Sequence, residues 1–228
     1  MARKRSRRYE KVAAKVDRTK RYPLTEGLAL IKSLQGPKFD EAVDIVVRIG
    51  IDPKKTDQLV RGSVSMPKGT GKSVRIAVFA EGEKAQAALA AGADFVGSAD
   101  LADKIEKGFT DFDMTIASPD MMRYVGKLGK VLGPQGKMPS PKAGTVTPNV
   151  ADAVREFKAG KIEFRTDAGA NVHAAVGKKS FAADDLAANI TAFVDHLRTL
   201  RPAQAKGTFI RKVVVSTSMG PGVQLAVE

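Results

Sequence analysis

The chain has 228 residues, of which 43% are hydrophobic and 28% are charged, so it can bury the core of one large domain or two modest ones. It contains no cysteine, which excludes disulfides, thiolate zinc sites and cysteine nucleophiles and agrees with a reducing cytosol. Its 38 basic and 25 acidic residues give a formal net charge of +13, which predicts a polyanionic partner and favours nucleic acid over an anionic membrane.

The charge is sorted by region. Residues 1–21 hold ten basic and two acidic residues, a net charge of +8, whereas residues 81–120 hold nine acidic and three basic residues, a net charge of −6. No apolar run approaches the roughly 20 residues of a membrane-spanning helix, and no apolar stretch follows the basic N-terminus, so we expect a cytoplasmic protein. The absence of tryptophan and an aromatic content of 6% argue against extensive stacking of bases on aromatic side chains.

The first predicted elements are two helices and two strands. Residues 6–16 and 25–34 have the composition of short helices, with Thr25 as a candidate N-cap of the second. Residues 42–49 are rich in β-branched side chains and predict a strand, and residues 61–66 predict a short extended piece.

The middle of the chain alternates strands with short helices. Strands are predicted at residues 73–80, 94–96 and 113–117, and helices at residues 83–91, 101–107 and 149–159. This alternation is typical of a parallel sheet and predicts a small Rossmann-like unit.

Residues 126–144, GKLGKVLGPQGKMPSPKAG, combine glycines, prolines and lysines with no acidic residue. Gly133, Pro134 and Pro139 interrupt the hydrogen-bond ladders of helices and strands, so the segment is predicted to be a long basic loop rather than a strand or a regular helix. Loops of this kind are held open for a partner rather than for packing, and lysine with free backbone N–H groups suits phosphate.

After residue 160 the pattern returns to β-structure. Residues 161–166 and 171–176 predict a hairpin around Asp167-Ala168-Gly169, and residues 183–200 predict a long helix. Two further strands are predicted at residues 208–218 and 223–227.

These elements predict the α/β class with two domains. Residues 1–67 and 160–228 form a discontinuous α/β sandwich whose antiparallel sheet uses both chain ends. Residues 68–159 form the inserted Rossmann-like βαβ domain, with short connections at residues 67–71 and 159–160.

An enzymatic alternative depends on residues 66–73, MPKGTGKS, which end as a P-loop ends. Met66 stands where the first glycine of a P-loop belongs, and a strand rather than a helix follows, so an interdomain turn is the favoured interpretation. His173 and His196 form neither an i, i+4 pair nor an HExxH motif, and no triad signature is present. We therefore predict no catalytic residue, no metal and no cofactor, and keep a nucleotide-phosphate enzyme using residues 69–73 as the rival.

Two short segments allow both a structural and a functional interpretation. Phe39 is either a core anchor, which the pattern alone favours, or an exposed ring that packs on a ribose or base. Ser216 and Ser218 lie on one face of a predicted strand, and Gly220 lets a backbone approach closely. Hydroxyl and backbone groups of this kind distinguish RNA from DNA by its 2′-hydroxyl.

Several of these segments together resemble the ribosomal protein L-one family in its bacterial form. The resemblance extends nearly from end to end and rests on KFDEAVDIVVRIGIDPKKTDQLVRGSVSMPKGTGK, AGADFVG, GKLGKVLGPQGKMPSPKAGTVT, AGKIEFRTD and STSMGPG. The long glycine-rich block and the STSMGPG block are its specific parts.

The resemblance implies a non-catalytic protein that binds large-subunit ribosomal RNA and forms the mobile stalk beside the tRNA exit site. It further implies assistance in the release of deacylated exit-site tRNA and repression of translation of the protein's own messenger RNA. The first domain would carry the main RNA surface, at Lys38, Phe39, Arg165, Asp167, Thr217, Ser218, Met219 and Gly220. The protein would be a monomer when free.

The chain departs from the family pattern at two positions. Ser218 stands where the family commonly has threonine, so the hydroxyl is kept and a methyl group is lost, and Ala42 lacks a hydroxyl that some relatives offer. The basic segment of the inserted domain would be an auxiliary contact to RNA or tRNA, through Lys130, Lys137 and Lys142. A generic RNA chaperone without a defined site is the remaining alternative.

Overall fold

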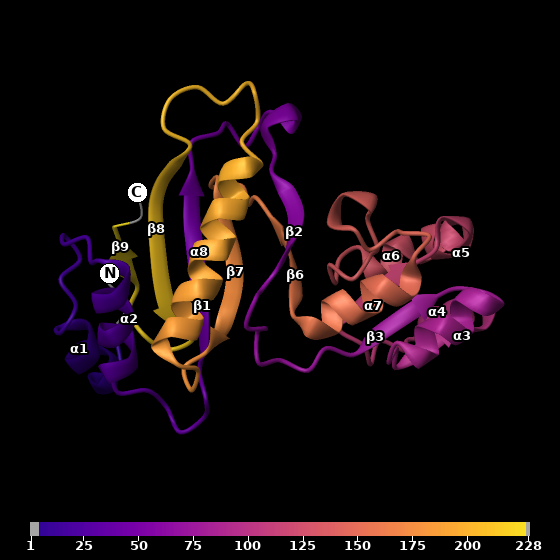
Figure 1. Cartoon of the computed structure of the whole chain (residues 1–228), viewed down its shortest axis with the longest axis horizontal. Coiled ribbons are helices and arrows are strands. Elements are labelled where there is room, and N and C mark those ends of the chain that lie inside the picture. Colours follow the sequence, from indigo (N-terminus) through magenta and orange to yellow (C-terminus); the bar gives the residue numbers. More distant parts are fainter. Residues whose placement is uncertain (1–4, 227–228) are drawn as a thin grey trace. The chain divides into compact units, whose positions relative to one another are not determined.

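A computed structural model describes residues 5–226, which divide into two compact units of mixed α/β structure (Figure 1). Unit 1 consists of Met1–Gly71 and Phe164–Glu228, and unit 2 consists of Lys72–Glu163. The predicted fold class is confirmed, with an antiparallel sheet in one unit and a parallel sheet in the other. None of the described helices is long and apolar enough to cross a membrane.

Unit 1 is built on a four-stranded sheet of order β7-β1-β8-β9. Its strands are β1 (Ala42–Ile49), β7 (Asn171–Lys178), β8 (Ile210–Thr217) and β9 (Val223–Leu225). All three pairings are antiparallel, and the central strand β1 comes from the N-terminal half of the chain while its neighbours come from the C-terminal half. The two chain segments of unit 1 are therefore joined through one hydrogen-bonded sheet.

Two helices, α2 (Leu24–Ser33) and α8 (Ala183–Thr199), cover one face of this sheet, and Figure 1 shows α8 lying along it. The sheet presents Val43, Ile45 and Val47 to them, and each of these side chains is fully buried. Burial alternates strictly along β1 because successive side chains of a strand point to opposite faces. Each large apolar side chain buried in this layer contributes about 1.5–3 kcal/mol to folding.

The remaining elements of unit 1 correct two predictions. The helix expected at residues 25–34 begins at Leu24 with Pro23 as its N-cap, which makes no side-chain cap bond, so Thr25 is not the cap. Strand β6 (Lys161–Arg165) pairs with β2 (Arg61–Ser65) in a separate two-stranded sheet, and β7 pairs with β1. The hairpin expected from residues 161–176 is therefore reduced to a single antiparallel bridge between Thr166 and Val172. Helix α1 (Arg7–Ala13) and the 3-10 turn η1 (Thr56–Gln58) complete the unit.

Unit 2 contains a parallel sheet of order β4-β3-β5, formed by β3 (Ile76–Phe79), β4 (Phe95–Gly97) and β5 (Met114–Ala117). One face packs against α4 (Ala99–Glu106), and the other packs against α3 (Glu83–Ala90) and α7 (Val150–Ala159). Strand β3 is buried on both faces, as its continuous apolar sequence predicts for the centre of a parallel sheet.

The segment at residues 126–144 differs from the predicted open loop. It continues the helical turns η2 (Pro119–Met121) and α5 (Met122–Val125) through η3 (Gly126–Leu128), α6 (Gly129–Leu132) and η4 (Pro141–Ala143). Leu128 and Leu132 are fully buried in the core that includes α4. The first half of the segment is helical because its glycines adopt right-handed helical angles and all its prolines follow residue 132.

Candidate RNA interface

The face of the four-stranded sheet opposite α2 and α8 carries no helix among the described elements of unit 1. On β1 this open face presents Asp44, Val46 and Arg48, the residues that alternate with the buried ones. The strand register pairs these three residues, in that order, with Ala175, His173 and Asn171 on β7. On the other side it pairs them with Ser216, Val214 and Lys212 on β8. Arg48, His173 and Lys212 are exposed, so in this set the two cations Arg48 and Lys212 outnumber the acidic Asp44.

One group of the predicted RNA-binding residues lies together at an end of this face. Strand β1 begins where β8 ends, and the backbone N–H of Ala42 donates to Ser218 Oγ at 3.1 Å while the N–H of Ser218 donates to the carbonyl of Ala42 at 3.1 Å. The N-terminal segment with Lys38 and Phe39 therefore meets residues 217–220, which we call the β8 turn.

Phe39 and Met219 are the most exposed large apolar side chains of this group, at 54% and 52%. The favoured interpretation of Phe39 as a core anchor is thus wrong. Lys38 and Ser218 are also exposed, whereas Thr217 is only 5% exposed and pairs with the buried Val43. Gly220 lies against Thr217, where an added Cβ would stand 2.3 Å from Thr217 Oγ1.

Of the remaining two predicted residues, Asp167 lies at the opposite end of the sheet, and Arg165 ends β6 in the separate two-stranded sheet. Asp167 binds Asn171, which pairs with Arg48 at the far end of β1. Ala42 and Arg48 are six positions apart in an extended strand, so the two groups are separated by about 20 Å. The structure thus divides the eight predicted residues between two places in unit 1 rather than gathering them in a single cluster, and the Thr217 side chain lies with Val43 on the helix-covered face.

The carboxylate of Asp167 is saturated by its own chain. It accepts hydrogen bonds from the backbone N–H groups of Asn171 at 2.7 Å and Gly169 at 2.8 Å, and it lies 3.2 Å from His173 Nε2. The bonds from Asn171, chiefly, hold the pKa of Asp167 far below its ordinary value against a small effect of burial. The residue shapes its turn and supplies one negative charge close to His173.

Three residues of the open face were missed from the sequence. His173 lies between the two groups, whereas Arg48, with Lys212 and Asn171 as its cross-strand partners, lies at the end that holds Asp167. The alternation in residues 42–49 already indicated the exposed face of β1, but only the strand register shows which residues of β7 and β8 adjoin it. Asp44 lies on the same face, where partial burial raises the pKa of its carboxyl, opposed by the charges of Lys178 and His173.

The three auxiliary lysines of unit 2 differ in their surroundings. Lys130 and Lys142 are exposed. Lys137 is partly buried, donates from Nζ to the carbonyl of Thr110 at 3.0 Å and lies 5.0 Å from the ring centre of Phe112. Thr115 Oγ1 also donates to the carbonyl of Lys137. This lysine is already engaged within unit 2.

The turn at residues 66–73 makes no phosphate cradle. The amide of Asn189 donates to the carbonyl of Gly69 at 2.9 Å, and Gly71 packs against Phe181. Lys72, which would have to reach a phosphate, instead donates to Asp113 at 2.8 Å.

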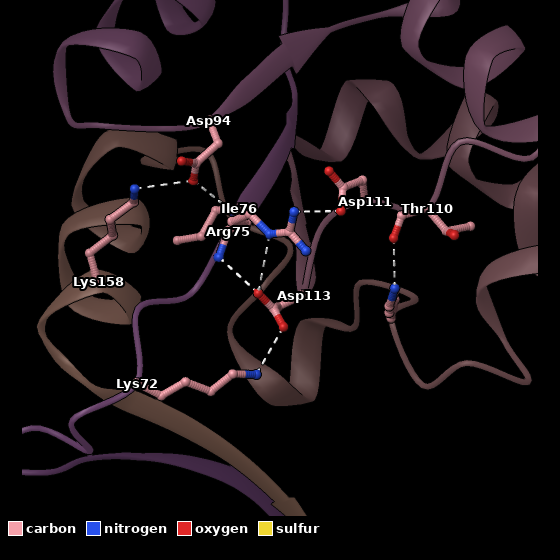
Figure 2. Close-up of polar contacts among 9 residues, drawn as sticks. Lys72, Arg75, Ile76, Asp94, Thr110, Asp111, Asp113 and Lys158 are labelled. Atoms are coloured by element: carbon pink, nitrogen blue, oxygen red, sulfur yellow. Dashed lines mark hydrogen bonds and ion pairs between the residues drawn. The ribbon is translucent and has the colours of Figure 1, made fainter. Parts of the chain in front are cut away.

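Figure 2 shows that Lys72 belongs to a network of polar contacts at the end of the unit 2 sheet where its strands begin. Arg75 binds Asp111 and Asp113, and Lys158 lies 3.1 Å from Asp94. The bond from Lys72, then the N–H of Arg75, lowers the pKa of the Asp113 carboxyl, so this carboxylate is a stable partner for the lysine. Within residues 5–226, no group of three metal-ligating side chains is assembled.

The sequence matches the model of the ribosomal protein L1p/L10e family over residues 30–221. It is 57% identical to large ribosomal subunit protein uL1 of Bordetella pertussis over 224 residues, covering 98% of this chain and 97% of that protein. It is 52% identical to the protein of the same name from Kosmotoga olearia, with 97% of this chain and 96% of that protein covered, and 54% identical to that of Nitrosomonas eutropha, with the same coverage. A match of this extent, together with the two-unit α/β fold, shows that the chain belongs to the ribosomal protein L1p/L10e family.

Proposed function

We propose that this chain is a structural RNA-binding protein of the large ribosomal subunit, located in the cytoplasm and bound to large-subunit ribosomal RNA. The relatives' shared name, large ribosomal subunit protein, supports the assignment, and so does the net charge of +13. The observation that carries the site is the exposure of Phe39 and Met219 beside the Ser218 hydroxyl at one end of a cationic sheet face. Large apolar side chains that stay exposed beside polar groups suit a contact surface.

The two ends of the open face have different roles in this proposal. The β8 turn with Lys38 and Phe39 makes the specific contacts, because exposed rings, hydroxyls and close backbone suit the bases and 2′-hydroxyls of a folded RNA. Arg48 and Lys212 at the far end, with Arg165 of β6, neutralise phosphates, which adds affinity without sequence selection. Asp167 acts by shaping the turn that adjoins His173.

We further propose that the bound protein forms the mobile stalk beside the tRNA exit site and assists release of deacylated tRNA. Lys130 and Lys142, which are exposed in unit 2, supply a contact to tRNA in this proposal. The same specific surface binds a mimic of the ribosomal RNA site on the protein's own messenger RNA and represses its translation. Ribosomal RNA and this messenger RNA must then compete for the protein, since they share one surface.

The hydroxyl of Ser218 provides the test of the site. Ser218→Val should weaken binding to the ribosomal RNA fragment by about 1–3 kcal/mol, because a polar group of the RNA is left unpaired and the N–H of Ala42 loses its acceptor. Ser218→Thr keeps the hydroxyl and should bind like the natural protein. The measurement is a titration with a fluorescent stalk-region fragment at fixed salt, with the melting temperature of each variant recorded.

A scrambled RNA of equal length separates this function from that of a generic RNA chaperone. The proposal expects much weaker binding to the scrambled RNA and no difference between the two Ser218 variants there. Equal affinity for both RNAs would contradict a defined site. Displacement of the ribosomal fragment by the leader of the protein's own messenger RNA checks the regulatory part, and failure to displace it at any concentration would exclude a shared surface.

A further inference from the structure

The backbone of Met219, in the middle of the β8 turn, is held at both its N–H and its carbonyl by side chains distant in the sequence. Its N–H donates to Glu41 Oε1 at 2.9 Å, and its carbonyl accepts from Arg8 Nη2 at 3.1 Å. Arg8 comes from helix α1, and Glu41 directly precedes β1. Neither residue is among those that the sequence singled out.

Glu41 is the one charged side chain among the buried residues of the described chain, with 1% of its surface exposed. Burying a carboxylate is costly unless it is paired and hydrogen-bonded, so its partners reveal its role. Lys179 Nζ lies 3.6 Å from Oε2 and also donates to the carbonyl of Leu34. Gly36 completes the pocket, since an added Cβ there would stand 2.3 Å from Glu41 Oε2.

Arg8 uses its guanidinium as a bridge between two loops. Nη1 donates to the carbonyl of Gln35 at 3.1 Å while Nη2 donates to that of Met219. The planar guanidinium offers these two carbonyls two donors in a fixed geometry, whereas a lysine would offer all its donors from one flexible atom. Arg8 makes no ion pair with a carboxylate in the described structure, so its visible function is to hold backbone.

Without these two side chains the β8 turn would keep few restraints of its own. Its remaining bonds are those between Ala42 and Ser218 and that from the N–H of Gly220 to the carbonyl of Thr217 at 3.1 Å. The exposed Met219 side chain is attached to the Cα between the N–H that Glu41 binds and the carbonyl that Arg8 binds. A surface that must match a folded RNA binds more tightly when it is ordered beforehand.

We propose that Glu41 and Arg8 are positioning residues for RNA recognition: they clamp the Met219 backbone at its N–H and its carbonyl and preform the surface made by Phe39, Ser218 and Met219. The proposal rests on the RNA-binding function proposed above. It assigns to helix α1 a role in specificity that its high positive charge alone would not indicate, because Arg8 acts through the β8 turn and not by neutralising a phosphate.

Arg8→Lys is the decisive variant, since it keeps the charge and removes the fork. We expect it to weaken binding to the ribosomal RNA fragment roughly tenfold, the effect of losing one charge-assisted hydrogen bond, and to leave scrambled RNA binding and the salt slope unchanged. Amide exchange at Met219 should accelerate. Arg7→Lys is the matched control, because Arg7 is exposed on the same helix, and it should change none of these quantities.

Arg8→Met and Glu41→Gln complete the test. If Arg8 instead contacted a phosphate, Arg8→Lys would retain affinity, and Arg8→Met would weaken both RNAs equally with a salt slope lower by about 0.7–0.9. That result overturns the clamp. Glu41→Gln keeps an acceptor for Met219 but loses the charge, so it should fall between the natural protein and Arg8→Lys in specific affinity.

Ser218→Val in the same assay distinguishes failure of the clamp from failure of the site. If Arg8→Lys keeps its affinity for the ribosomal RNA fragment while Ser218→Val loses affinity, the clamp is rejected and the RNA-binding site remains in place. Unchanged affinity in both variants rejects the clamp and the site together. Accelerated exchange at Met219 combined with a selective loss of ribosomal RNA binding supports the clamp.

Discussion

Asp167 is an acidic side chain in a surface proposed to meet a polyanion, and its hydrogen bonds account for its presence there. The carboxylate closes the turn between β6 and β7 through Asn171 and Gly169. Ala170 follows with a positive φ of 61°, which is rare for a residue with a side chain and is retained only where the surroundings hold it. The negative charge of Asp167 therefore stabilises the backbone of the turn between β6 and β7 and is not an unpaired charge that faces RNA.

Replacing this carboxylate should show a distinct dependence on pH. The pKa of Asp167 lies below its ordinary value of 3.8 in the folded protein, so its stabilisation is fully present above that pH and is lost as the pH falls towards the folded pKa. We expect Asp167→Ala to lower the free energy of unfolding by about 1 kcal/mol at pH 7, a modest figure because the side chain is 40% exposed.

Urea unfolding of the natural protein and the variant between pH 7 and pH 2.5 measures this difference. The gap should stay constant down to about pH 4 and narrow below it. Asp103→Ala, which removes an exposed carboxylate from α4, is the control and should change little. A gap that instead widens in acid would show that Asp167 does not act through its charged form.

At the scale of elements, residues 126–144 illustrate how packing overrides local chemistry. Their glycines and prolines predicted an open loop, but Leu128 and Leu132 recur four residues apart and bury one helical face on the parallel sheet. The turn residues are concentrated after residue 132, and there the chain is held by bonds such as that from Lys137 to Thr110. The segment is mainly a covering layer of unit 2, with lysines on its outer side.

Replacing the partly buried lysine of this segment should therefore affect stability, and replacing its exposed lysines should affect the salt dependence of RNA binding. Lys137→Met removes the bond to Thr110 while keeping the stem over Phe112, so it should destabilise the protein by about 1 kcal/mol and leave the salt slope of RNA binding unchanged. Replacing Lys130 and Lys142 together should leave stability unchanged and reduce the slope by about 1.5 if each meets a phosphate.

Thermal unfolding and the salt dependence of binding to ribosomal RNA, with and without exit-site tRNA, measure both effects. A slope change in Lys137→Met would mean that RNA binding draws this lysine away from Thr110. An unchanged slope in the double variant, in every RNA tested, would remove the segment from the RNA interface.

At the scale of the whole molecule, the proposed specific contacts all belong to unit 1, although its two chain segments are separated by the whole of unit 2. A protein in which residues 72–163 are replaced by a short glycine linker between Gly71 and Phe164 should bind the ribosomal RNA fragment within about tenfold of the full chain, since one factor of ten corresponds to only 1.4 kcal/mol. The domain roles on which this rests are predictions from the family resemblance.

The same titration with the full chain and the shortened chain tests this expectation. The melting curve shows whether unit 1 remains folded when unit 2 is removed. A folded shortened protein that has lost all selectivity for ribosomal RNA would assign specificity to unit 2 and contradict the proposed division of roles.

Much of the fold could be predicted from the sequence, because burial leaves a local period in the residues. The alternation of Val43, Ile45 and Val47 predicts both a strand and its buried face, and the strand–helix alternation after residue 73 predicts a parallel sheet. The hairpin expected from residues 161–176 was mispredicted because strand pairing between distant segments leaves no local period in the residues. Its turn chemistry was right, since Asp167 and Asn171 bond across the turn, but β6 and β7 found partners elsewhere in the chain.

The candidate site was predictable in its residues and not in its geometry. Phe39 and the STSMGPG block are conspicuous in the sequence, whereas their adjacency depends on the antiparallel pairing of β1 with β8. No sequence pattern indicated that Arg8 and Glu41 bind the Met219 backbone, because an arginine in a basic helix and a glutamate beside a strand look like ordinary surface residues.

The sequence by itself therefore determined the class of the fold, the elements, the sorted charge and the family to which the chain belongs. These are properties of composition, of period and of residue identity, each legible over a few neighbouring positions. Tertiary structure decided which strands pair, that Lys137 bonds to the carbonyl of Thr110, and that Glu41 and Arg8 both bind the backbone of Met219. Such contacts join residues up to 211 positions apart, and they arise only when the whole chain closes around its two cores.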